Sequence, residues 1–491
     1  MSIQLTDINH DDQPPAGAHR DPIGVVILDK DGWSASCPEI GVRSEGAGRP
    51  TELEGGITWV SNLGFHDARG VRAAQSRGDV SLRGKDWIFP KIDEALDDWG
   101  ARSYARKDQA DIMATLLNRV MRLSYETVRT YLGASPSKEQ AAFKTMETSP
   151  SLPNGLRNAM GAAIDQCNPS DKKTSARITD SIKYGAYVLR ENRVEEGEIF
   201  VSLRAPRLVH ALDVLQRPVP APGKWQESDL GDRVLSENTV AKLHDLDRPV
   251  LLYTKAVPKN RTEDAFLSSW TVPMGPGRSR SFYTLEEVRA MKDAYDFMSP
   301  HATVGPGWRS SSGLEMLRAL ITISGYDLFA HTSWSVGVVA ENILRGVMRS
   351  GLTKNRDTEA VVSPESVWVA ANDRVAMLPM IRKMEDYGVI VSSGYAGDLG
   401  FKFSSDPEMA TMVATGAWES GLHMQVQTAV DMRRMGVEPP CDKESYGGSH
   451  LANLQAIMSQ GGKVAPFWKI DEMNDKVSGE RAAAFRDFLG I

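Results

Sequence analysis

The sequence predicts a mixed α+β protein that is mostly α-helical, with short β-strands and hairpins between the helices. Apolar residues recur at helical spacing over several long segments, and short β-branched runs are scattered among them. In addition, 42 glycines and 26 prolines interrupt a chain of 491 residues, which indicates long Gly/Pro-rich loops. Strands and helices do not alternate regularly enough for a doubly wound sheet or a barrel. We therefore expect an irregular multi-helix architecture.

The N-terminal part of the chain begins with a polar segment. Residues 1–22 are rich in Asp, Pro and Gly, which predicts an extended or flexible arm. The apolar run from Ile23 to Leu28 predicts a strand, and Asp29-Lys30-Asp31-Gly32 predicts the turn of a β-hairpin. Residues 39–56 are typical of a loop, and residues 57–60 of a short strand.

A long helix is the clearest element of the following region. Residues 108–132 carry an apolar stripe at helical spacing, and Gly133 ends the pattern. Further along the chain, the sequence predicts a helical region over 171–192, a strand over 199–203 and a short helix over 207–215. Together with the preceding strands, these elements form an expected N-terminal α+β region, residues 23–216.

A proline-rich segment follows this region. Residues 217–225 contain three alternating prolines, which favour an extended, semi-rigid polyproline conformation. We interpret this segment as a connector. The chain beyond it, residues 226–491, is expected to form a helix-rich C-terminal region.

Two similar turns stand out in the C-terminal region. Gly275-Pro276-Gly277 and Gly305-Pro306-Gly307 are each followed by arginines and serines and then by an apolar helix pattern. The patterns predict one helix over 285–298 and another over 314–325. Each entry shows the spacing of a capping box, in which a side chain at either end satisfies a backbone N–H of the first turn. The capping pairs are Thr284 with Glu287 and Ser312 with Glu315.

The remaining elements are predicted from the spacing of apolar residues and from the residue types found at helix ends. Ser363 followed by Pro364 and an acidic residue is typical of a helix start, and Pro379 is expected to bend or break that helix. A Gly-rich segment between two apolar runs predicts a hairpin with a long loop. The expected strands are 249–257, 389–391 and 401–403, and the expected helices are 334–348 (fully buried), 364–387, 409–435 and 480–489.

Composition and motifs narrow the function classes. No apolar run approaches the ~20 residues needed to cross a bilayer. The three cysteines lie far apart, and the nine histidines show no metal-ligand spacing. The sequence has no nucleotide-binding glycine motif, metalloprotease motif or hydrolase nucleophile elbow. We therefore expect no metal, no cofactor and no membrane association, and a location in the cytoplasm or, for a viral protein, in the virion. Enzymatic activity is the less favoured class.

Aromatic residues in loops and edges favour self-association. The chain has 11 tryptophans and 20 methionines, residue types that are enriched at protein–protein interfaces. Several of the tryptophans lie in segments predicted as loops or edges, among them Trp225, Trp270, Trp308 and Trp468. Together with the extended arm and the Gly/Pro loops, they favour a non-enzymatic, self-assembling structural protein. We expect a viral or phage coat or shell subunit that encloses a genome, for example double-stranded RNA, through weak non-specific contacts.

Two other functions fit the sequence. A cytosolic enzyme or binding protein could hold a phosphorylated ligand at the Gly-Pro-Gly turns, through Arg278, Arg280 and Arg309, because helix N-termini and guanidinium groups bind anions. An RNA-binding accessory protein could use residues 101–225, which carry 19 basic and 13 acidic side chains and hence a net charge of +6. The whole chain carries −7.

Overall fold

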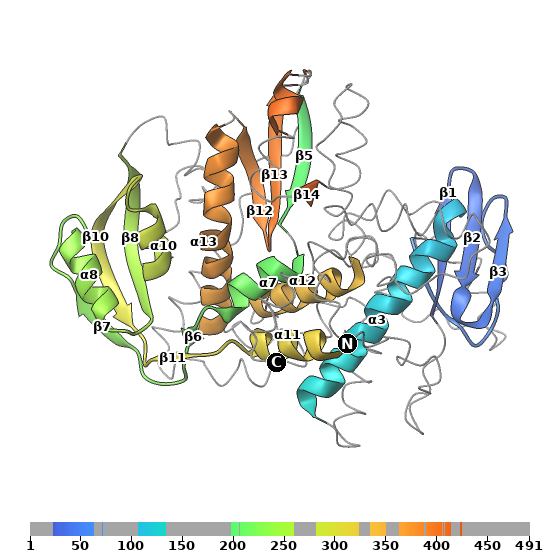
Figure 1. Ribbon diagram of the computed structural model, residues 1–491, viewed down its shortest axis with the longest axis horizontal. Coiled ribbons are helices and arrows are strands. Elements are labelled where there is room, and N and C mark those ends of the chain that lie inside the picture. The colour runs from blue at the N-terminus through green and yellow to red at the C-terminus, as the bar shows by residue number, and fades with distance from the viewer. Residues whose placement is uncertain are drawn as a thin grey trace, which may run out of the picture. The chain divides into compact units, whose positions relative to one another are not determined.

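The computed structural model shows a mixed α+β fold with several small sheets, which confirms the α+β part of the prediction (Figure 1). The chain divides into two compact units, one of residues 1–159, 318–339 and 446–491, and another of residues 160–317 and 340–445. The structure describes residues 23–62, 71, 107–133, 198–205, 207–259, 281–323, 334–349, 363–386, 389–404, 406, 408–413 and 423–424.

The first unit contains a four-stranded sheet of order β3-β2-β1-β4. The predicted hairpin is confirmed: β1 (Ile23–Asp29) pairs antiparallel with β2 (Gly32–Cys37), and β1 also pairs parallel with β4 (Thr58–Ser61). The loop expected over 39–56 is only partly correct. It contains β3 (Val42–Gly46), whose residues alternate between half-buried and exposed as in an edge strand.

The hairpin turn is tied to the long helix. The carboxylate of Asp29 accepts one hydrogen bond from the backbone N–H of Asp31, at 2.8 Å, and another from that of Lys107, at 2.9 Å. Lys107 opens the 3₁₀ turn that leads into α3 (Ala110–Leu132), as the apolar stripe predicted. The Asp29 side chain therefore accepts hydrogen bonds from backbone N–H groups of two segments that lie 76 residues apart.

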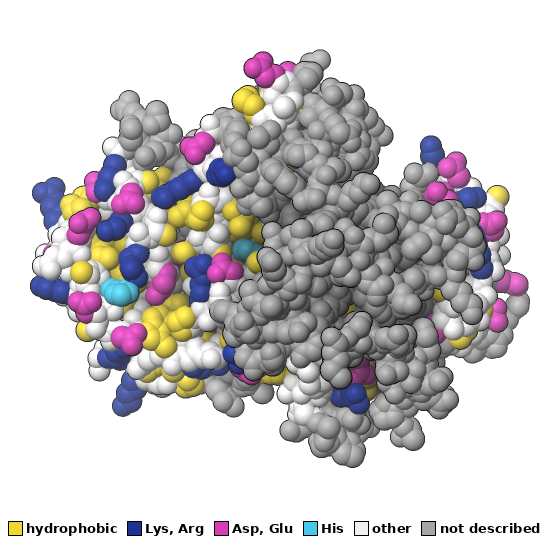
Figure 2. All heavy atoms as spheres, in the orientation of Figure 1, with side chains coloured by type: hydrophobic (Ala, Val, Ile, Leu, Met, Phe, Trp, Pro, Cys, Tyr) yellow, Lys and Arg dark blue, Asp and Glu magenta, His cyan; other side chains and the backbone are white. Residues whose placement is uncertain are grey.

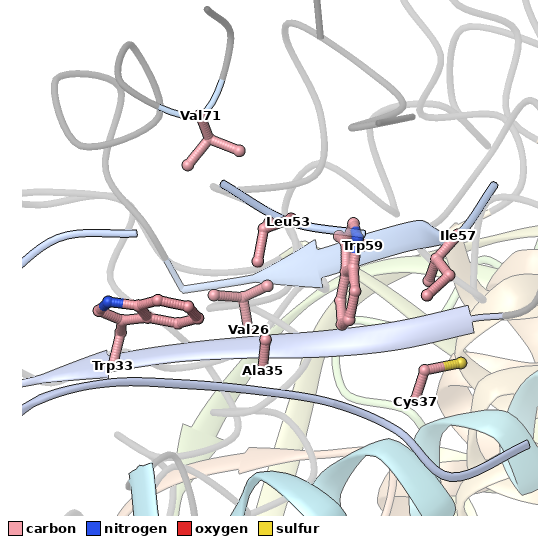
Figure 3. Close-up of a cluster of buried hydrophobic side chains, with 8 residues drawn as sticks. All are labelled: Val26, Trp33, Ala35, Cys37, Leu53, Ile57, Trp59 and Val71. Carbon is pink, nitrogen blue, oxygen red and sulfur yellow. The ribbon is translucent and has the colours of Figure 1, made fainter. Parts of the chain in front are cut away.

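Apolar side chains from β1, β2, β4 and the segments around them form the core of this unit (Figure 3). The Trp59 ring is fully buried, and its indole N–H donates to the carbonyl of Glu54 at 3.0 Å. A Cβ at Gly24 would lie 2.3 Å from this ring, so only glycine allows β1 to approach it. The core residues are Val26, Trp33, Ala35, Cys37, Leu53, Ile57, Trp59 and Val71.

The second unit contains a sheet of order β7-β10-β8-β9, in which all neighbours are antiparallel. The predicted strand over 249–257 is confirmed as β8 (Val250–Pro258). The other strands are β7 (Gln226–Asp229), β9 (Phe282–Thr284) and β10 (Tyr295–Val304), and α8 (Glu237–Asp245) lies in the same part of the chain.

The helix predicted over 285–298 is wrong in its second half. Helix α10 (Leu285–Met291) begins with the predicted capping box, but residues 295–298 belong to β10. Tyr295 and Phe297 are buried while their neighbours are more exposed, which is the period of a strand. The same apolar residues also fit a helical spacing, so tertiary pairing with β8 decided between the two.

The proline-rich connector and the second Gly-Pro-Gly turn form one structure inside the second unit. Strand β6 (Val219–Pro220) pairs antiparallel with β11 (Trp308–Arg309), and the Ala221 N–H donates to the Gly307 carbonyl at 2.8 Å. A Cβ at Gly223 would lie 2.6 Å from the Pro306 ring.

A second sheet of this unit has the order β12-β13-β5-β14, with all pairs antiparallel. The predicted strand over 199–203 is confirmed as β5 (Glu198–Arg204). The hairpin of β12 (Ile390–Tyr395) and β13 (Asp398–Ser404) is also confirmed, but not its long loop. Ala396 and Gly397, with φ of 49° and 85°, close it as a two-residue turn of the I′ kind. The remaining strand is β14 (His423–Met424).

Four predicted helices are confirmed: α7 (Arg207–Gln216), α11 (Ser312–Ile323), α12 (Trp334–Arg349) and α13 (Pro364–Asp386). The hydroxyl of Ser363 accepts from the Glu365 N–H, so the predicted start of α13 is correct.

Of the bend or break predicted at Pro379, the break is wrong, since α13 continues to Asp386. A proline inside a helix costs about 3 kcal/mol. Burial of the apolar side chains around it offsets this cost, because each buried one contributes roughly 1.5–3 kcal/mol. These side chains are Met377, Leu378, Ile381 and Met384.

Several predictions lie outside the described residues: the arm over 1–22, the helices over 171–192 and 480–489, and most of the helix over 409–435 beyond residue 413. That helix is wrong at His423–Met424, which form strand β14 because they pair with the end of β5. Residues 408–413 are helical. Among the described helices, none has the length and apolar character that crossing a membrane requires.

Candidate functional site

Five charged side chains meet beside the turn between β12 and β13. Arg204 ends β5, Arg207 begins α7, Glu341 and Arg345 lie one turn apart on α12, and Asp398 begins β13. Arg204 donates to Asp398 at 2.6 Å and also contacts Glu341. Arg207 donates to Glu341 at 2.6 Å, and Arg345 donates to Asp398 at 2.9 Å. We call these five residues the ionic cluster.

The ionic cluster is largely removed from water. The side chain of Glu341 is 2% exposed, and those of Arg204 and Arg345 are 5% and 3% exposed. Burial opposes ionisation of Glu341, but the charges of Arg204, Arg345 and Arg207 outweigh it and lower the pKa of Glu341 to about 2. Burial and the charge of Arg204 lower the pKa of Arg207 to about 10, so Arg207 remains cationic at neutral pH. Glu341 is therefore the shared anion of three guanidinium groups.

A second buried pair also contacts this turn. Nε2 of His210, on α7, lies 2.6 Å from Oδ1 of Asp373, on α13. Oδ2 of Asp373 accepts from the N–H of Ala396 at 2.9 Å, and a Cβ at Gly397 would lie 2.8 Å from the His210 ring. The turn is thus fixed to α7 and α13 as well as to the ionic cluster.

The His210–Asp373 pair has the composition of an acid–base dyad, but its position does not suit catalysis. The two side chains are 3% and 2% exposed, so a substrate could not contact them. Among the described residues, no group of three or more His, Cys, Asp or Glu side chains could hold a metal. The contacts of the cluster and the pair instead hold β5, α7, α12, α13 and the hairpin together.

Arg309, a predicted anion-binding residue, contacts an anion of the protein itself. Its guanidinium pairs with the buried carboxylate of Glu365 and donates to the Ser310 carbonyl at 3.2 Å. Oε1 of Glu365 accepts from the hydroxyl of Ser311 at 2.9 Å and from the N–H and hydroxyl of Ser312, both at 2.8 Å. The N-terminus of α11 therefore binds a carboxylate, as the helix dipole favours. The structure places Glu365 where the sequence suggested a phosphate.

The predicted self-association residues differ in their surroundings. Trp225 is 8% exposed, and its ring lies 5.7 Å from that of Trp368, so it packs inside the chain. Trp308 is half-buried in β11. The predicted site residues outside the described part of the chain are Arg278, Arg280, Trp270 and Trp468.

The sheet β7-β10-β8-β9 has an exposed aromatic side chain that the sequence analysis did not single out. Tyr253 is 49% exposed, with the Phe282 ring 5.0 Å and the His301 ring 6.5 Å away. Val234, 42% exposed, forms an isolated bridge with Met298 of β10. Apolar side chains also lie among charged ones on the face of this part of the chain seen in Figure 2 (left). A signal was present in β8, where the exposed Tyr253 and Lys255 alternate with buried residues.

Comparisons with known proteins give little similarity. No protein-family model matches the sequence, and no curated protein matches it either. Among solved structures, the chain is similar to "Phi29 DNA polymerase complexed with primer-template DNA and incoming nucleotide substrates (ternary complex)". The TM-score is 0.33 at 10% identity, over 55% of this chain and 54% of that chain. An orthorhombic crystal form of that polymerase gives a TM-score of 0.32 at 11% identity, over 55% and 54%. This chain thus matches about half the length of the polymerase, and scores of this size do not indicate a shared fold.

Proposed function

We propose that this chain is a non-enzymatic subunit that assembles with copies of itself, as a viral or phage coat or shell protein that encloses a genome. The observation that carries the proposal is the exposure of large apolar side chains on both units. Ile40 of the first unit is 49% exposed, and Val234, Leu246 and Tyr253 of the second unit are 42%, 48% and 49% exposed. A subunit of a closed shell contacts neighbours through more than one surface, and each unit has exposed apolar side chains that could take part in such contacts.

The interior of the second unit supports a structural role. Its buried charged groups contact one another across several helices and strands, and the contacts described above hold those elements together. Such contacts give a subunit one defined shape, and a repeating assembly depends on a defined shape.

The phosphorylated-ligand alternative is weakened by the surroundings of Arg309. Its charge is balanced by the fully buried Glu365, and a bound phosphate would have to compete with that carboxylate. The RNA-binding alternative is weakened in a similar way. Arg204 and Arg207 contribute to the net positive charge of residues 101–225, but both lie in the ionic cluster, and Arg217 pairs with Asp213 at 3.0 Å.

Particle formation tests the proposed function. We expect the purified chain to form regular particles in negative-stain images, with a sedimentation coefficient far above that of a 53.9 kDa monomer. Nuclease-resistant nucleic acid inside those particles would support a genome-enclosing role. A monomer at every concentration, over a range of salt and pH, would exclude a self-assembling shell.

A further inference from the structure

One face of the sheet β7-β10-β8-β9 combines an aromatic centre with both signs of charge. Asp229, His301, Tyr253 and Phe282 are successive cross-strand partners over the four strands. Cross-strand partners project to the same side of a sheet, and so do residues two apart on one strand, which adds Lys255. Lys255 pairs with Met298, and Met298 pairs with Val234. We call these seven residues the Tyr253 face.

The Tyr253 face is open to solvent in its middle. Tyr253 is 49% exposed, and the side chains of Asp229 and His301 are 80% and 56% exposed. Lys255 is also exposed, whereas Met298 is half-buried. Within the chain, Asp229 lies 3.8 Å from Nδ1 of His301 and accepts from the Gly231 N–H at 3.2 Å, yet its carboxylate remains accessible. An apolar centre with charges around it is the arrangement of many protein–protein interfaces.

The positions of the opposite charges make this face complementary to itself. Neighbouring strands are about 4.8 Å apart, so Asp229 lies roughly 10 Å from Tyr253 across the sheet, and Lys255 lies about 7 Å from it along β8. Consider a two-fold axis that lies in the plane of the face, passes near Tyr253 and runs halfway between the strand direction and the cross-strand direction. Such an axis exchanges the two directions. Because the two separations are similar, it would bring Lys255 of one copy close to Asp229 of another. The two Tyr253 rings would meet near the axis. The strands of the two copies would cross at nearly a right angle, which is one of the common packings of two sheets.

We infer that the Tyr253 face docks against the same face of a second copy of this chain, in a two-fold contact that pairs Lys255 with Asp229. The inference rests on the proposed function and names one contact of the assembly. A nucleic acid fits this face less well, because Asp229 and Glu227 place negative charge along its β7 edge. A second copy supplies both charges in the required places.

A charge exchange tests the pairing. Lys255→Asp places like charges against Asp229 of the second copy, and Asp229→Lys does the same against Lys255, so we expect each variant to weaken association by about tenfold or more. The double variant restores opposite charges and should associate within about threefold of wild type. Lys30→Glu, in the exposed turn between β1 and β2, is a control for a change of net charge elsewhere. Sedimentation velocity over a concentration series gives the affinities, and circular dichroism shows that each variant is folded.

Tyr253→Cys gives an independent test. If the two side chains face each other near the axis, a bismaleimide long enough to span the ~10 Å between two packed sheets should produce a covalent dimer that wild type does not form. An absence of dimer in assembling protein would contradict the inferred contact.

The outcomes separate this inference from the proposed function. A wild-type chain that never assembles refutes both. Assembly that all the face variants leave unchanged refutes the Tyr253 face and leaves the proposed function standing. Single variants that weaken association without rescue in the double variant refute the pairing of Lys255 with Asp229.

Discussion

Replacing Glu341 with glutamine removes the anion that Arg204, Arg207 and Arg345 share. The folded-state pKa of Glu341 is about 2 against an ordinary value of 4.5, and each pKa unit corresponds to about 1.36 kcal/mol, so its ionised form stabilises the fold by roughly 3 kcal/mol. Because the pKa is lowered on folding, this stabilisation is complete above pH 4.5 and is lost as the pH falls towards 2. Glutamine keeps the shape of the side chain but leaves Arg207 without this carboxylate, and leaves Asp398 as the carboxylate that Arg204 and Arg345 share. We therefore expect Glu341→Gln to lower the free energy of unfolding at pH 7 by about 3 kcal/mol.

Urea unfolding followed by tryptophan fluorescence measures this loss. The difference between wild type and Glu341→Gln should shrink to roughly half at pH 3, where wild type has lost part of the same contribution. The exposed Glu408→Gln serves as a matched control and should change stability by less than about 0.5 kcal/mol. A Glu341→Gln variant as stable as wild type at pH 7, or a difference that does not shrink in acid, would refute the role given to the ionic cluster.

Three other substitutions test contacts described above. Gly397→Ala combines a φ of 85° with a methyl 2.8 Å from the neighbouring imidazole, so thermal unfolding should show a loss of about 1–3 kcal/mol. Gly48→Ala, with a φ of 72° and open space around it, should lose less stability. Equal losses in the two variants would argue against a steric contribution at Gly397. Trp368→Ala removes a fully buried ring and should lower the free energy of urea unfolding by about 3–5 kcal/mol. Arg309→Met leaves Glu365 buried without its cation and should lower the free energy of unfolding by about 3 kcal/mol. Phosphate should not bind wild type more tightly than this variant in calorimetry, and a clear preference for wild type would revive the phosphate site.

Local signals predicted many of the elements. The hairpin at Asp29 to Gly32, the helix start at Ser363 and the capping box at Thr284 depend on residues within a few positions of each other. Helix α8 could have been found by the same reasoning, since the Ser236 hydroxyl accepts from the Thr239 N–H.

The ionic cluster had no such signal. Arg204 contacts Glu341 and Asp398, which are 137 and 194 residues away along the chain. Nothing in the sequence near any of these residues distinguishes a buried charge from a solvated one. The carboxylate at the N-terminus of α11 was missed for the same reason, because Glu365 lies 53 residues from Ser312. The N–H groups at a helix N-terminus predicted that an anion would be favoured there. Only the tertiary structure shows that this anion is the carboxylate of Glu365.

Helix α13 contributes two buried charges and one partly buried charge to three different neighbours. Glu365 contacts Arg309 and the start of α11, Asp373 contacts His210 and the Ala396 N–H, and Arg374 contacts Glu287 of α10 at 2.6 Å. Opening any part of this helix would separate one of these charges from its partner and leave that partner uncompensated. Its central amides should therefore exchange with deuterium only when the whole second unit unfolds, later than those of the exposed strand β7.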